Sequence, residues 1–168
     1  MNIKVSVPYT GLEEYKSVKN VILSGKFVSG KLVKKFEQKF SKYLNLKYAT
    51  AFNSGTASLH AALNALNLKK NHEVIVPSIS FMSTATAVLH QGCIPIFCDV
   101  KIKNYCMDAD DFKKRITKNT KAVIIVHFAG SSCEVDKIIK IARKKKIFVI
   151  EDCAQAHGTK FKNKKVGS

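Results

Sequence analysis

The chain has 168 residues, of which 46% are hydrophobic, and it carries a formal net charge of +17. This composition excludes a disordered chain, and no apolar run approaches the roughly 20 residues that a membrane span needs. Five cysteines occur in none of the spacings typical of zinc sites. We interpret them as reduced thiols of the core, which predicts a cytoplasmic protein of one domain.

The high positive charge raises the alternative of a nucleic-acid binder. Its distribution argues against that alternative, because residues 51–100 contain only two basic and two acidic side chains. The remaining lysines fall on the polar faces of predicted helices, and no aromatic residues alternate with them as stacking platforms would require. We therefore interpret the charge as a solvated, lysine-rich surface that can attract anionic substrates.

In the first third of the chain the pattern predicts two amphipathic helices, a strand and a third helix. Thr10 and Glu13 have the spacing of a capping box, which opens a helix that stops near Ser24 and Gly25. The other elements are expected at residues 29–44, 48–52 and 54–66, in that order.

The rest of the chain alternates apolar strands with amphipathic helices. We expect strands at residues 72–77, 93–100, 122–126 and 148–150, the last an interior strand, and helices at 81–90, 108–116 and 134–145. A small hairpin, turning at Asn163, is expected at 160–166. Strands that are apolar on both faces and separated by helices predict an α/β fold, a three-layer sandwich with a mostly parallel sheet. Ligands bind such sheets outside the carboxyl ends of the strands.

Residues 53–57, Asn-Ser-Gly-Thr-Ala, follow the predicted strand at 48–52 and begin the next helix. Free N–H groups at a helix start, small residues, and the hydroxyls of Ser54 and Thr56 suit a phosphate. The alternative is an ordinary serine cap followed by a tight turn, and this segment alone does not decide between them.

Two more segments follow strands at the same edge. Phe81 opens the helix after the strand at 72–77, although such a residue is more often part of the core. Glu151 and Asp152 end the last strand, and burying a carboxylate costs several kcal/mol unless a cation meets it. The next basic residue toward the C-terminus is Lys160. Asp152 could also be a simple helix cap.

Together these segments predict one ligand that has a phosphate, a flat ring, a cationic ring nitrogen and a polar oxygen within reach of Gln155. Pyridoxal 5′-phosphate (PLP) has all four. Its protonated pyridine nitrogen would be the cation that Asp152 lacks, and an ionised aspartate would keep that proton in place.

The stretches NSGTASLHAALNAL, HEVIVPSISFMSTATAVLHQGCIPIFCDV and VIEDCAQAHGTKFKNKKVGS resemble the DegT-type sugar aminotransferases, which are PLP enzymes of the aspartate-aminotransferase fold. The resemblance implies amino transfer from glutamate to a nucleotide-linked keto sugar, in a homodimer. It also implies roles for named residues. The phosphate would lie at Ser54, Gly55, Thr56 and Ala57, Phe81 would stack on the ring, Asp152 would pair with the ring nitrogen, and Gln155 would contact the ring hydroxyl. His127 also matches the family, but we interpret it as a satisfied histidine at a strand end.

The family pattern also implies a lysine that forms the Schiff base with PLP, and we expect this lysine beyond residue 168. Residues 1–168 would then be the PLP-binding large domain without that lysine and without the small domain. Lys160, Lys162, Lys164 and Lys165 are expected in a solvated hairpin and not as substitutes. A non-catalytic remnant that pairs with a full-length homologue, or a sister sugar dehydratase, remain alternatives. No metal site is expected.

Overall fold

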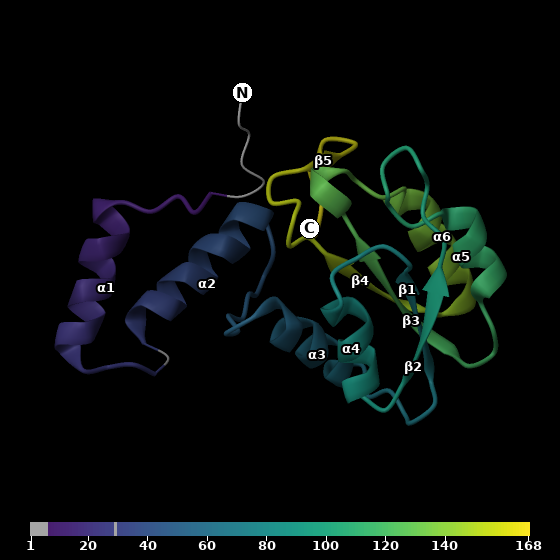
Figure 1. Ribbon diagram of the computed structural model, residues 1–168, viewed down its shortest axis with the longest axis horizontal. Helices are drawn as coiled ribbons and strands as arrows, with labels where there is room; N and C mark the ends of the chain where they lie inside the picture. Colours follow the sequence, from purple (N-terminus) through teal and green to yellow (C-terminus); the bar gives the residue numbers. More distant parts are fainter. Residues whose placement is uncertain (1–6, 29) are drawn as a thin grey trace.

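A computed structural model describes residues 7–28 and 30–168 (Figure 1). At its centre lies a four-stranded sheet in the order β2-β1-β3-β4, and every neighbouring pair of strands is parallel. Its strands are β1 (Glu73–Pro77), β2 (Ile94–Cys98), β3 (Thr120–Val126) and β4 (Phe148–Asp152). These four strands were predicted from the apolar runs, and the mostly parallel sheet is confirmed.

Helices cover both faces of this sheet. On one face, α3 (Gly55–Ala65) and α4 (Ser83–His90) pack against Ala122 and Ile124 of β3. On the other face, α5 (Ala109–Arg115) and α6 (Val135–Lys145) pack against Val123 and Ile125. Because successive strand residues point to opposite faces, the unbroken apolar run of β3 supplies both cores. The predicted three-layer sandwich is confirmed.

The N-terminal helices lie outside this sandwich. They are α1 (Leu12–Ser24) and α2 (Lys31–Leu44), and neither contains a buried residue. α1 begins one residue later than predicted, because the Glu14 carboxylate accepts the Gly11 N–H at 2.7 Å in place of the expected Thr10 and Glu13 pair. It ends at Ser24 as predicted. The start predicted for α2 at Ser29 lies outside the described residues.

Three details of the strand and helix predictions were wrong. Residues 48–52 form no strand, because they lie beside no other strand in the described chain and an isolated extended segment has no ladder to join. Among the described residues, β4 pairs only with β3, so it lies at the edge of the sheet and not in its interior. The fourth helix begins at Ser83, so Phe81 precedes it by two residues.

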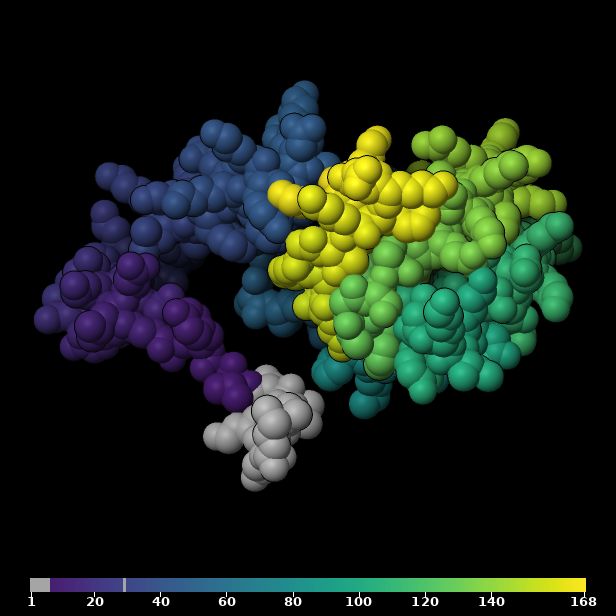
Figure 2. All heavy atoms as spheres, turned by 90° about the horizontal axis from the view of Figure 1, so that it is seen from above, coloured from purple at the N-terminus to yellow at the C-terminus, as the bar shows by residue number. Residues whose placement is uncertain are grey.

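The C-terminal segment returns toward the N-terminal helices. The predicted hairpin is confirmed as β5 (Lys160–Phe161) and β6 (Lys164–Lys165), and its turn residues Lys162 and Asn163 have φ values of 46° and 65°. In Figure 2 this yellow segment lies between the blue helix α2 and the green part of the body. The Lys165 ammonium donates to the Tyr43 carbonyl of α2 at 2.6 Å.

Two composition-based expectations can be compared with the fold. No helix among the described residues is long and apolar enough to cross a membrane. All five cysteines are free thiols, and four of them are buried, which agrees with core thiols. Cys153 is half-buried at the end of β4.

Candidate functional site

The carboxyl edge of the sheet gathers the three segments singled out by the sequence. β1 and β4 are both neighbours of β3, so their ends are about 10 Å apart at the usual strand spacing. α3 leads back to the start of β1 through a short connection, which places the first turn of α3 at the carboxyl edge. The topology therefore brings the α3 start, the β1–α4 loop and the β4 end to one edge of the sheet.

The first turn of α3 has a conventional cap and leaves other groups free. The Ser54 hydroxyl accepts the Ala57 N–H at 3.2 Å, so the serine-cap interpretation is correct. The N–H groups of Gly55 and Thr56 have no partner in the described part of the chain, and a side chain added at Gly55 would meet nothing within 4 Å. Backbone donors at a helix N-terminus beside open space fit an anion.

Phe81 lies in the loop between β1 and α4. The loop is closed by a hydrogen bond of 2.8 Å between the hydroxyls of Ser80 and Thr84, and the Phe81 carbonyl accepts the Thr84 N–H at 3.0 Å. The Phe81 side chain is 72% exposed. The alternative of a core phenylalanine is therefore wrong, and an aromatic face is free at the edge of the sheet.

Asp152 ends β4 with one carboxylate oxygen occupied and no basic partner. Its Oδ1 accepts the Ala154 N–H at 3.0 Å within a turn, and no helix follows β4 among the described residues, so the alternative of a helix cap is wrong. No ion pair involving Asp152 occurs within residues 7–28 and 30–168. The second oxygen can accept from a cationic donor, which fits a protonated ring nitrogen.

Glu151, the neighbouring carboxylate, is satisfied within the protein. Its Oε2 lies 2.9 Å from the Nε2 of His127 and also accepts the Gly167 N–H at 2.9 Å. Burial raises the pKa of the Glu151 carboxyl, but the two hydrogen bonds outweigh burial and hold that pKa below its usual range. The expectation of a missing cation thus applies to Asp152 and not to Glu151, whose partner is 24 residues distant in the chain.

His127 is fully buried, and both of its ring nitrogens are hydrogen-bonded. Nδ1 accepts the Cys133 N–H at 3.2 Å, so the proton of the neutral ring is on Nε2, which faces Glu151. The interpretation of His127 as a satisfied histidine at a strand end is confirmed.

Gln155 lies in the turn after β4. Its Oε1 accepts the Ala129 N–H at 2.8 Å, so the oxygen of the side-chain amide is engaged. The amide NH2 remains available to donate to a ligand oxygen. Like Ser54 and Asp152, Gln155 is therefore a residue whose side chain is oriented by a hydrogen bond within the protein.

His127, Glu151 and Cys153 have ligand atoms within 4.8 Å of one another, as a metal site would require. Two observations oppose that use. The Cys133 N–H occupies Nδ1, which keeps a proton on the nitrogen that would have to bind the ion. Burial and the nearby carboxylates raise the pKa of the Cys153 thiol to about 12, whereas metals bind the thiolate. The geometry suits a hydrogen-bond network better than a metal centre.

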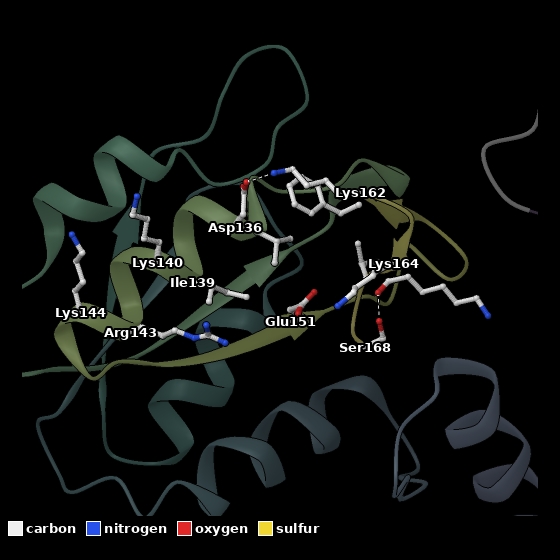
Figure 3. A pocket seen from close by; sticks show the side chains of 13 residues that line it. Asp136, Ile139, Lys140, Arg143, Lys144, Glu151, Lys162, Lys164 and Ser168 are labelled. Carbon is white, nitrogen blue, oxygen red and sulfur yellow. Dashed lines mark hydrogen bonds and ion pairs between the residues drawn. The ribbon is translucent and has the colours of Figure 1, made fainter.

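Glu151 also lines a basic groove (Figure 3). It has a volume of about 760 Å³, lies between α6 and the C-terminal segment, and includes the side chains of Lys140, Arg143, Lys144, Lys162, Lys164 and Lys165. The prediction of a solvated hairpin fits Lys160, Lys162 and Lys164, whose side chains are exposed, whereas Lys165 is half-buried. Lys162 pairs with Asp136 at 2.7 Å, and Lys165 contacts Tyr43. The groove was not predicted, because it joins lysines from two distant segments.

The chain matches the family model of the DegT/DnrJ/EryC1/StrS aminotransferase family over residues 8–168. It belongs to this family. One relative, the GDP-perosamine synthase of Escherichia coli O157:H7, is 38% identical over 161 residues, which are 95% of this chain and 44% of the relative. The chain therefore spans less than half the length of this relative.

Solved structures agree with the family assignment. The aminotransferase from Psychrobacter cryohalolentis superimposes with a TM-score of 0.91 and 35% identity, over 95% of this chain and 41% of that one. The E. coli GDP-4-keto-6-deoxy-D-mannose-3-dehydratase with bound hydrated PLP also superimposes with a TM-score of 0.91, at 31% identity over 99% of this chain and 44% of that one. The proteins similar to this chain thus include a GDP-perosamine synthase, an aminotransferase and a sugar dehydratase.

Proposed function

We propose that this chain is the cofactor-binding part of a PLP-dependent aminotransferase that moves an amino group from glutamate to the keto group of a nucleotide-linked sugar. The observation that carries the proposal is Asp152, a carboxylate at the carboxyl end of a parallel strand with no basic partner among the described residues. Family membership supports the same cofactor. Amino-sugar or polysaccharide biosynthesis in the cytoplasm, by a homodimer, is part of this proposal.

The α3 start would hold the phosphate of the cofactor. Gly55 and Thr56 offer free N–H groups and Thr56 a hydroxyl, whereas Ser54 and the N–H of Ala57 cap each other and shape the turn. Because small side chains leave the space beside Gly55 open, a phosphate can approach the backbone closely.

The remaining contacts concern the ring. Phe81 would cover one face of it with its exposed side chain, Asp152 would accept a hydrogen bond from the protonated ring nitrogen, and Gln155 would donate its amide N–H to the ring oxygen. When bound, the protonated ring supplies an electron sink for the amino-transfer chemistry. The carboxylate at Asp152 keeps the proton on the ring nitrogen, which is the contribution of this chain to that chemistry.

We infer that the lysine that moves the proton during transfer, and the small domain, are supplied outside residues 1–168. The relatives that support this inference are more than twice as long as this chain. Two lysines of the hairpin already have partners: Lys162 pairs with Asp136, and Lys165 donates to the Tyr43 carbonyl. On this proposal the 168-residue chain binds the cofactor without turnover, alone or beside a full-length homologue.

Sugar dehydration is a second candidate, because the E. coli dehydratase superimposes on 99% of this chain. Both reactions would use the same contacts to phosphate and ring, so the residues described here serve either one. Identifying the acid–base residue that acts with this chain would separate them, since a lysine is expected for amino transfer.

Binding of pyridoxamine 5′-phosphate to the 168-residue chain, followed by calorimetry, tests the proposal. This ligand lacks the aldehyde, so it cannot react with surface lysines. We expect Asp152→Asn to weaken binding on the order of tenfold, because the charge-assisted hydrogen bond is lost. The control is Asp136→Asn, which removes an aspartate paired with Lys162. Failure of the wild-type chain to bind, or equal effects of the two substitutions, would contradict the proposal.

A further inference from the structure

The loop that follows β3 is hydrogen-bonded to the segment that follows β4. The His127 N–H donates to the Asp152 carbonyl at 3.1 Å, and the Ala129 N–H donates to the Gln155 side chain at 2.8 Å. One residue further, the Gly130 carbonyl accepts the Thr159 hydroxyl at 2.9 Å. Residues 127–130 therefore contact residues 152–159, which include the proposed ring ligands Asp152 and Gln155, through three hydrogen bonds.

His127 adds a contact through its ring. Nε2 donates to the Glu151 carboxylate, next to Asp152, while the Cys133 N–H holds Nδ1. The ring is fully buried, so neither contact competes with water. Main chain and ring together tie the end of β3 to two consecutive residues of β4, which is an edge strand with no neighbour on its other side in the described chain.

Ala129 determines which group Gln155 can present. The residue has a φ of 47°, an uncommon value for alanine, and its N–H points to the Gln155 Oε1. Because the oxygen is held by the Ala129 N–H, the amide is fixed with its NH2 group, which has no partner among the described residues, as the donor. A donor at this position suits a ring oxygen that carries negative charge better than a neutral hydroxyl.

We propose that His127 and Ala129 are positioning residues for the cofactor ring: His127 holds the Asp152 end of β4 in place, and Ala129 orients the Gln155 amide as a donor. The inference rests on the proposed function and extends it to two residues that would not touch the ligand. It also gives the His127–Glu151 pair a function other than metal binding.

The first test compares pyridoxamine 5′-phosphate binding in three variants of the 168-residue chain. His127→Leu removes the donor to Glu151 and should weaken binding about tenfold, as the loss of groups that orient ligands does elsewhere. His127→Gln keeps an N–H donor and should bind within about threefold of wild type. His90→Gln changes an exposed histidine on α4 as the control. Wild-type affinity in His127→Leu, or equal losses in both His127 variants, would overturn the inference.

A second test needs neither ligand nor a folded leucine variant. Nitrogen NMR shifts of the wild-type His127 ring should report a proton on Nε2 and none on Nδ1. Gln155→Ala should speed hydrogen exchange of the Ala129 amide, whereas Gln91→Ala, which removes a glutamine that donates to the His60 carbonyl, should not. A proton on Nδ1, or an unchanged Ala129 amide, would overturn the inference. If wild type fails to bind, the proposed function fails, and these two readouts still decide the positioning contacts.

Discussion

The α/β body and the two N-terminal helices contain similar apolar side chains, yet they bury them very differently. β1 and β3 hold Ile75, Val123 and Ile125 at 0% exposure. In α1, the residues Leu12, Val18 and Ile22 form a helical stripe with exposures of 74%, 57% and 57%. In Figure 2, α1 stands apart from the body.

The difference shows that an amphipathic pattern specifies a helix but not its partner. The pattern of α6 and that of α2 are of the same kind, and α6 packs against the sheet whereas α2 contains no buried residue. Short helices gain most of their stability from packing, and α1 packs few of its side chains against the rest of the protein. The two regions should therefore respond differently to equivalent substitutions.

The largest contrast is expected between two apolar truncations. Phe112→Ala removes a fully buried ring of α5 and should lower the free energy of unfolding by about 3–5 kcal/mol. Leu12→Ala on α1 should change it by less than about 0.5 kcal/mol. Urea unfolding followed by circular dichroism measures both. A loss above about 1.5 kcal/mol for Leu12→Ala would mean that the α1 stripe is packed in solution.

Two glycines with positive φ give the next contrast. Gly167 has a φ of 76°, and an added Cβ would lie 3.0 Å from the Cys153 sulfur; Gly25 has a φ of 62° and nothing within 4 Å. Gly25→Ala should cost about 1 kcal/mol of backbone strain. Gly167→Ala should cost about 2–3 kcal/mol, because overpacking is added to the strain. Equal midpoint shifts in urea would show that the Cys153 contact relaxes freely.

A smaller effect is expected from Glu151 as pH falls. Its folded pKa lies below its usual range, so the carboxylate stabilises the fold above the unfolded value of about 4.3. This stability is lost as pH falls through the folded pKa. Glu151→Gln keeps an acceptor for His127 and Gly167 but cannot titrate. Wild type should therefore lose about 1–2 kcal/mol more than the variant between pH 7 and pH 3. Parallel stability curves would refute this assignment.

The smallest effect concerns the link between α2 and the hairpin. The Lys165 ammonium lies 3.3 Å from the Tyr43 ring centroid and donates to the Tyr43 carbonyl. Lys165→Met should cost up to about 1 kcal/mol, typical of an exposed cation–π contact. It should also speed proteolysis between α2 and α3, while the neighbouring Lys164→Met should not. Equal cleavage rates in the two variants would show that this contact does not hold α2.

Local sequence patterns were sufficient to predict much of the secondary structure of the α/β body. The apolar runs of β1 and β3 predicted strands of a mostly parallel sheet, because residues buried on both faces leave no polar alternation. The Ser54 cap and the turn at Asn163 were also readable, since each depends on residues a few positions apart. The segment at 48–52 has strand-like residues, but pairing depends on a neighbour that its own residues cannot specify.

By itself, the sequence determined the three layers, the parallel sheet and the family, and it predicted a role for Asp152, because periodicity and short motifs are local properties. Only the tertiary structure decided that Glu151 is satisfied by His127, that Ala129 orients Gln155, and that Phe81 is exposed. The first two contacts join residues 24 and 26 positions apart, and the exposure of Phe81 depends on which other residues cover its side chain. Such contacts are set by how the strand ends meet at the edge of the sheet.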